Sequence, residues 1–185
     1  MKITRIIAVM MIMLMTLALA GCDQENKPQQ PKEAPKAVAE QKPEKTAEDK
    51  LTIKLYFPNN DATKLIAVEK TIKVKGEDKY RAAVEALMEG TDDSKLTVVI
   101  PKQAKLLGVS VKGDTAQVDF DKGLIKHFNG GSTGEEFLVG SIVNTLTEFP
   151  EIKKVQITIE GKRVETIKGH MDTSKPLSRM TELIK

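Results

Sequence analysis

The chain has 185 residues, with 29 Lys and Arg against 26 Asp and Glu, a net charge of +3, two histidines and a single cysteine. The excess of positive charge is small, and no block of Lys and Arg is interleaved with aromatic residues, which excludes the usual signature of nucleic-acid binding. One cysteine cannot form an internal disulfide, and two histidines are too few for a His-rich zinc site. We therefore expect no nucleic-acid partner, no cofactor and no metal.

The N-terminus predicts a lipoprotein signal peptide over residues 1–21. Lys2 and Arg5 precede an uncharged run at 6–20 that is rich in Ile, Met and Leu. A basic start, an apolar middle and a small-residue exit are typical of a secretory signal, and the run is shorter than the roughly 20 residues that span a bilayer. Leu-Ala-Gly-Cys at the exit resembles a bacterial lipobox, which implies cleavage before Cys22 and a diacylglyceryl group on its sulfur, with palmitate among the acyl chains.

This reading places the mature protein outside the cytoplasm, held by lipid at the outer face of the cytoplasmic membrane. Two alternatives remain for the same residues. One is an ordinary signal peptide with an incidental cysteine, and the other is an uncleaved anchor helix. Lipidation is favoured because it removes a lone thiol from an exported chain.

Residues 22–50 predict a tether. They contain four of the eight prolines and no aromatic residue. Such a segment cannot bury enough apolar surface to offset its ordering entropy, so we expect disorder with polyproline II character. A charged interaction arm is the alternative. All seven aromatic residues lie between Tyr56 and Phe149, so residues 51–185 are predicted to form one folded domain.

Hydrophobic periodicity in this domain predicts six strands and two helices. The strands are expected at residues 51–57, 67–74, 107–111, 116–120, 155–159 and 164–167. The helices are expected at 78–88 and 134–149, with Pro150 ending the second. Gly113-Asp114 and Gly161-Lys162 predict hairpin turns. The order ββ-α-ββ-α-ββ predicts an α+β fold, in which an antiparallel or mixed sheet carries two helices on one face.

The start of the second helix has the spacing of a capping box. In Ser132-Thr133-Gly134-Glu135, the Ser132 oxygen is expected to accept an N–H of the first turn, and the Glu135 carboxylate to accept the Ser132 N–H. The helix dipole also favours an acid here. A catalytic Glu135 is the alternative hypothesis.

A hydrolase is the rival functional class. His170 and Asp172 lie close in sequence, and Ser132, Ser141 or Glu135 could complete a catalytic group with them. No nucleophile elbow supports this hypothesis.

Two binding hypotheses were also weighed. Asp119, Asp121 and Asp172 could help hold a cation, although Asp119 lies on the polar face of a strand and a solvated carboxylate is the simpler interpretation. A module that binds cell-wall glycan or a small ligand is a further alternative, and the absence of Trp with only two Tyr to serve as sugar platforms argues against the glycan.

Several segments stand out by their order and spacing: Leu55–Asn59, Val118–Phe120, Gly131–Glu135, Ser141–Leu146, Phe149–Pro150, Val155–Gly161 and Gly169–Asp172. Together they resemble the GerMN domain family of sporulation and spore-germination lipoproteins. The resemblance covers nearly all of residues 51–185, in a single-domain form. It implies a non-enzymatic extracytoplasmic module with a fold similar to ring-building motifs, acting in sporulation, germination or envelope assembly.

Together these features predict a membrane-anchored protein-interaction or scaffold module of the cell envelope. The predicted interaction surface comprises Ser132, Glu135, His170 and Asp172, which are polar positions in the segments that most resemble the family. Its partner is expected to be another envelope protein.

Overall fold

The computed structural model describes residues 49–75 and 78–185. The predicted signal peptide, Cys22 and the predicted tether up to residue 48 lie outside the described residues. The first strand begins at Asp49, so its first two residues precede the predicted start of the domain. Within the described ranges, no helix combines the length and the apolar composition needed to cross a bilayer.

The domain begins with a long hairpin. β1 (Asp49–Pro58) and β2 (Leu65–Val74) pair antiparallel along their whole length. Leu55 and Phe57 point into the core and are at most 1% exposed, as the alternating pattern predicts. The side-chain oxygen of Asn59 closes the connecting turn by accepting two backbone N–H groups. Both predicted strands are confirmed.

A helix and a second hairpin follow. α1 (Lys79–Glu89) ends at Gly90, whose φ of +91° favours glycine. β3 (Leu106–Lys112) and β4 (Thr115–Phe120) pair antiparallel around Gly113, which also has a positive φ. The helix and the two-residue hairpin turn are therefore confirmed.

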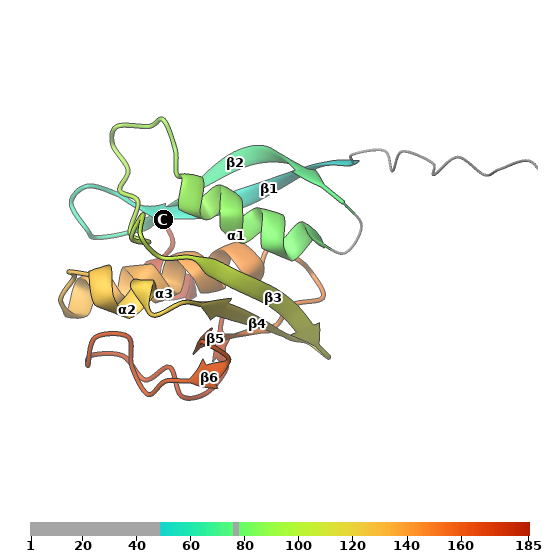
Figure 1. Cartoon of the computed structure of the whole chain (residues 1–185). Helices are drawn as coiled ribbons and strands as arrows, with labels where there is room; N and C mark the ends of the chain where they lie inside the picture. The colour runs from blue at the N-terminus through green and yellow to red at the C-terminus, as the bar shows by residue number, and fades with distance from the viewer. Residues whose placement is uncertain (1–48, 76–77) are drawn as a thin grey trace, which may run out of the picture. The chain divides into compact units, whose positions relative to one another are not determined.

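α3 (Ser132–Leu146) lies at the centre of the domain. Every residue from Phe137 to Leu146 is buried, so the helix has no solvated face along this stretch. A helix that is apolar on all sides needs cover on all sides. In Figure 1, α3 runs between the β1–β2 hairpin and the sheet that contains β3, β4 and β5. The helix ends at Leu146, earlier than predicted, and a turn leads on to Pro150.

The larger sheet has the order β3-β4-β5-β6, with β7 also on β5. β5 (Lys154–Ile159) is parallel to β4. After β4 the chain crosses back through α2 and α3, so that β5 begins beside the start of β4 and runs in the same direction. β6 (Lys162–Arg163) and β7 (Leu177–Ser178) are short antiparallel partners of β5. The second hairpin is thus confirmed, with its turn at Glu160-Gly161, one residue earlier than predicted, while the predicted strand at 164–167 is wrong.

The fold class is confirmed. The domain is α+β, its larger sheet is mixed, and α1 and α3 cover one face of that sheet (Figure 1). The β1–β2 hairpin is a separate sheet on the other side of the two helices. A short helix, α2 (Gly123–His127), was not predicted.

Residues 177–185 connect three parts of the fold. The Asn144 amide on α3 donates to the Met180 carbonyl at 3.0 Å and accepts the Met180 N–H at 2.8 Å. Beyond the 3-10 turn η2 (Thr181–Leu183), the Lys185 N–H donates to the Leu65 carbonyl at 3.1 Å. This segment therefore contacts β5, α3 and β2.

Candidate functional site: a loop held by a buried carboxylate

Glu135 is the most unusual charged residue in the core. It sits in the first turn of α3 and is fully buried. One carboxylate oxygen accepts the N–H groups of Ile167 and Lys168 at 2.8 and 2.9 Å, and the other accepts the N–H of His170 at 2.9 Å. A buried carboxylate needs such donors, and the helix start adds a favourable dipole. Glu135 therefore holds a distant loop through its backbone.

We call residues 164–174 the anchored loop. Besides the Glu135 contacts, the Thr173 N–H donates to the Glu165 carbonyl at 2.7 Å, and the Thr173 hydroxyl donates to the Val164 carbonyl at 3.0 Å. The Gln156 amide on β5 donates to the Thr173 carbonyl at 2.8 Å. The loop thus lies over β5 and is fixed at both ends. This explains why Val164 and Ile167 turn inward without forming a strand.

The anchored loop presents polar side chains to solvent. Lys168, His170 and Asp172 are exposed, while Ile167 is only 2% exposed and points into the core. The Ser174 hydroxyl and N–H both donate to the Asp172 carboxylate, and these hydrogen bonds hold the pKa of Asp172 below its usual value. The result is an ordered and charged surface loop.

The capping-box prediction is wrong. Gly131 is the N-cap residue and no side chain caps the helix. Ser132 is the first helical residue and is exposed. The Glu135 side chain is drawn away from the helix start because the anchored loop offers it three N–H donors. Of the four residues predicted for the interaction surface, Ser132, His170 and Asp172 are at the surface, and Glu135 lies beneath it.

The hydrolase hypothesis finds no support in this geometry. Ser141 lies inside α3, fully buried, and its hydroxyl has no hydrogen-bond partner among the described residues. Glu135 touches His170 only at the backbone N–H. Across residues 49–75 and 78–185, no hydrogen bond joins the His170 ring to a serine or to Asp172. A nucleophile and a base are therefore not brought together.

The aspartates considered for a cation have structural contacts instead. Asp119 accepts the Thr158 hydroxyl at 2.8 Å and the Gly161 N–H at 2.7 Å, so it shapes the turn after β5. Asp121 accepts the N–H groups of Lys105 and Gly123. The described part of the chain contains no group of three potential metal ligands.

A second polar cluster was not predicted from the sequence. The Tyr56 hydroxyl donates to Glu148 at 2.7 Å, and Arg179 contacts both. Burial raises the pKa of Tyr56, and the hydrogen bond to Glu148 adds to that effect. Burial would raise the pKa of Glu148, but the hydrogen bonds from Tyr56 and Arg179 outweigh it and lower that pKa. The cluster fastens the segment after β7 to α3. The sequence shows that these three residues are present, but it does not show that they contact one another in the fold.

Neither tyrosine is available as a sugar platform. Tyr56 is 3% exposed. Tyr80 packs edge-on against Phe149, with ring centroids 4.9 Å apart, and donates to Glu151 at 2.7 Å. The glycan hypothesis therefore gains no support from the aromatic residues.

A helical layer between a two-stranded and a mixed sheet makes this domain an α+β module, and this architecture fits the ring-building fold that the resemblance implies. The chain belongs to the Germane family, described as "Sporulation and spore germination", whose model matches residues 54–165. This confirms the resemblance to the GerMN domain.

Individual relatives agree with this assignment. The chain is 27% identical over 146 residues to the spore germination protein GerM of Bacillus subtilis, covering 75% of this chain and 38% of that protein. It therefore spans about two fifths of the length of this relative.

Solved structures support the same fold. The first GerMN domain of GerM aligns with a TM-score of 0.55 at 26% identity, covering 70% of this chain and 98% of that one. A provisionally assigned lipoprotein of Clostridium perfringens aligns with a TM-score of 0.52 at 26% identity, covering 71% and 87%. The tandem GerMN domains of GerM align with a TM-score of 0.54 at 24% identity, covering 80% and 50%.

Proposed function

We propose that this protein is a lipid-anchored protein of the cell envelope whose single domain, residues 49–185, binds a protein partner and catalyses no reaction. Lipid on Cys22 fixes it at the outer face of the cytoplasmic membrane, and residues 23–48 tether the domain. Its place in sporulation or germination is proposed from its relatives, GerM among them.

One observation carries the interaction role. The buried carboxylate of Glu135 is fully engaged with three backbone N–H groups, so it organises a surface loop rather than a reaction. Rigid presentation lowers the entropy lost when a partner binds. A loop that a buried carboxylate holds in one conformation is therefore well suited to binding a partner.

Two separate features support the anchor. The residues before Cys22 have the layout of a lipoprotein signal. A structural relative from Clostridium perfringens is itself assigned, provisionally, as a lipoprotein. Two or three acyl chains give stable attachment, at about 0.8 kcal/mol for each buried CH₂.

The anchor is tested by mass spectrometry of the protein extracted from membranes. We expect a mature N-terminus at Cys22 that carries a diacylglyceryl group, and we expect the Cys22→Ser variant to leave the membrane fraction. Unmodified Cys22 in membrane-extracted protein would contradict the anchor.

The interaction role is tested by photo-crosslinking in cells. A photo-reactive residue at His170 should capture a partner protein, whereas one at Lys112, an exposed residue of β3, should not. Capture of the same protein from both positions, or from neither, would refute recognition through the anchored loop.

A further inference from the structure

One edge of β2 exposes unpaired backbone groups. The Tyr56 N–H points away from β2, since it donates to the Thr145 hydroxyl on α3 at 3.1 Å. Ala67 on β2 lies directly opposite Tyr56. In an antiparallel ladder the backbone N–H and C=O of such a pair both point away from the other strand, so those of Ala67 point away from β1. The same alternation places the Leu65 carbonyl on the outer edge of β2, and it does accept the Lys185 N–H from outside the hairpin. The outward-facing backbone groups of Ala67 and Glu69 have no hydrogen-bond partner within the described residues.

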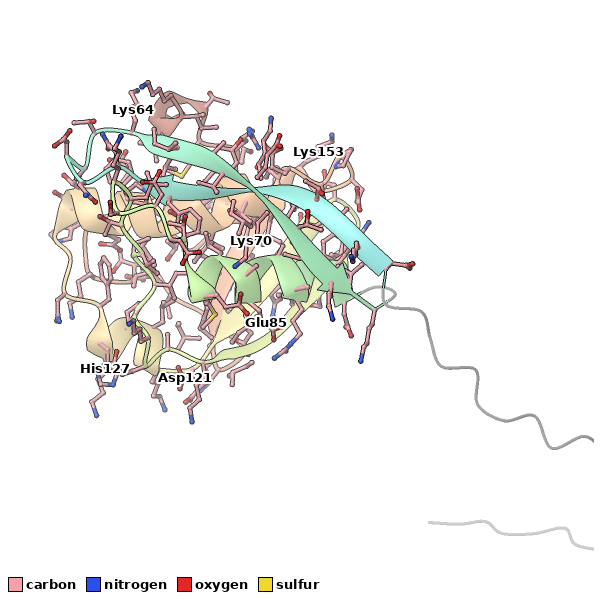
Figure 2. The ribbon with its side chains drawn as sticks, turned by 90° about the horizontal axis from the view of Figure 1, so that it is seen from above. Lys64, Lys70, Glu85, Asp121, His127 and Lys153 are labelled. Atoms are coloured by element: carbon pink, nitrogen blue, oxygen red, sulfur yellow. The ribbon has the colours of Figure 1, made fainter. Side chains whose placement is uncertain are left out.

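One residue of the C-terminal segment already pairs with this edge. Ile184 forms a parallel bridge with Leu65, and pairing stops there. The stretch of β2 beyond that bridge runs between the labelled residues Lys64 and Lys70, across the layer nearest the viewer in Figure 2, and Ala67 and Glu69 on it are exposed. Strand edges of this kind bind extended peptides through main-chain hydrogen bonds.

Two cavities follow the same edge, on the face of β2 that packs toward α1. The first has a volume of about 580 Å³ and includes Ile66 and Leu96 in its wall. The second has a volume of about 450 Å³ and includes Val68. Ile66 and Val68 are neighbours on one face of β2, which corresponds to a spacing of ~6.6 Å. Alternate side chains of an added strand have the same spacing, so each would enter one cavity.

The charges of the second cavity select its occupant. Its wall contains four acids, Glu69, Glu89, Asp92 and Asp93, against the single cation Lys70, which forms an ion pair with Glu89 at 3.0 Å. Val68 gives the same cavity its accessible apolar surface, with Leu55 and Phe57 buried behind it. A Lys or Arg side chain matches this combination, because its stem packs on apolar surface while its charge reaches the acids.

The first cavity has a different balance. It combines Ile66 and Leu96 with three lysines and two aspartates, so its charges nearly cancel. The Lys64 ammonium is already engaged with the Glu182 carbonyl at 2.7 Å. An apolar side chain is therefore the better match here.

We propose that the edge of β2 binds an extended segment of a partner protein by strand addition. The segment carries an apolar residue in the first cavity and a Lys or Arg, two residues away, in the second. This inference rests on the protein-interaction role proposed above, but it uses a surface other than the anchored loop.

The test uses the full-length protein in detergent and two fluorescent, Thr-rich ten-residue peptides. One carries Leu-Thr-Lys at its centre and the other Lys-Thr-Leu, so that both strand directions are covered. Ala67→Pro removes an outward N–H and places a ring on the edge, while the ladder to β1 keeps its hydrogen bonds. Ala67→Val keeps the N–H and is the matched control. One peptide should bind the wild type and the valine variant, and bind the proline variant about tenfold more weakly.

A charge swap tests the second cavity. Asp92→Lys should weaken the bound peptide several-fold, and replacing the peptide's Lys by Glu should restore binding to that variant but not to the wild type. Failure of both peptides to bind the wild type, or equal binding to the two Ala67 variants, would overturn the proposal. A dimer of the full chain that Ala67→Pro dissociates would also overturn it, since the occupant would then be a second copy. Partner capture at His170 in the crosslinking experiment would leave the proposed function standing in each of these cases.

Discussion

The carboxylate of Glu135 determines the shape of a loop that lies more than thirty residues further along the chain. The contact is between one side chain and backbone N–H groups, so the identities of Lys168 and His170 are free to serve recognition. This division separates the residue that builds the loop from the residues that the loop presents.

Replacing Glu135 should therefore weaken the fold as well as the loop. Glu135→Ala leaves three N–H groups without an acceptor, and at roughly 1 kcal/mol for each the free energy of unfolding should fall by about 3 kcal/mol. Hydrogen exchange at the amides of Ile167, Lys168 and His170 should accelerate. Glu136→Ala, one residue along the same helix, is the control and should do neither. Unchanged exchange at the three amides would show that the loop holds itself.

A pH effect is expected at the surface. Hydrogen bonds from Lys79 and Tyr80 lower the pKa of Glu151 to about 2. Because the pKa of Glu151 is lower in the folded state than in the unfolded state, its ionised carboxylate stabilises the fold at pH values above about 4.5. This contribution is lost as the pH falls from 4.5 toward 2. Because both partners of the ion pair are partly exposed, at 35% and 43%, solvent screening limits the contribution to less than about 1 kcal/mol.

Urea denaturation between pH 7 and pH 2 measures this contribution. Glu151→Gln should lower the unfolding midpoint slightly at pH 7 and should match the wild type at pH 2. A difference that grows as the pH falls would contradict the assignment. Glu165→Gln is a suitable control, because Glu165 is exposed and its side chain forms no hydrogen bond or ion pair within the described residues.

Sequence reasoning has a clear limit at this scale. The S-x-x-E spacing at Ser132 and Glu135 is local, and it predicted a local contact. The actual partners of Glu135 lie on a loop whose position depends on the whole fold, so no short-range rule identifies them. His170 and Asp172, by contrast, were predicted at the surface because they are polar residues in the segments that resemble the family, and both are exposed.

Elements with strong local signals were predicted well. The hairpin around Gly113 and the helix that ends at Gly90 combine a hydrophobic period with a residue suited to positive φ. The helix α2 was missed because five residues are too few to show a period. The parallel pairing of β4 and β5 was missed because it depends on how α3 crosses the sheet, which alternation within a strand does not reveal.

Asn144 gives a prediction for the packing of α3 against the segment that follows β7. Its amide matches one N–H and one carbonyl of Met180. Asn144→Asp keeps the acceptor but turns the donor into a second carboxylate oxygen, which then faces the Met180 carbonyl. We expect a loss of about 2–3 kcal/mol in unfolding free energy, since a buried polar group is left unpaired.

Hydrogen exchange resolves that effect by location. The Met180 and Leu183 amides should exchange faster in Asn144→Asp, while those of the β3–β4 hairpin should change only as far as global stability does. Thr147→Ser, at the C-cap of the same helix, keeps the hydroxyl that donates to the Val143 carbonyl and is the matched control. Equal acceleration throughout the domain would mean that this segment does not unfold separately.

For the molecule as a whole, the proposed tether sets how far the domain reaches from the membrane. A coil of its length spans roughly 30 Å, from about 5–6 Å times the square root of the residue number. Replacing residues 27–48 by a Gly/Ser sequence of equal length should keep the crosslinks made from His170. Deleting residues 27–46 should reduce them, because the domain is then held against the membrane. Retention of the crosslinks after the deletion would show that the distance from the membrane does not matter.

The contact between Glu135 and the anchored loop also couples the free energy of partner binding to the free energy of unfolding. A partner that binds the loop only in its ordered form also favours the carboxylate in place, and with it the first turn of the helix on which both sheets pack. At a concentration one hundred times its dissociation constant, such a partner raises the unfolding free energy by about 2.7 kcal/mol. Occupancy at the surface can therefore be read as a rise in melting temperature of the whole domain, and this link is lost when Glu135 is replaced by alanine.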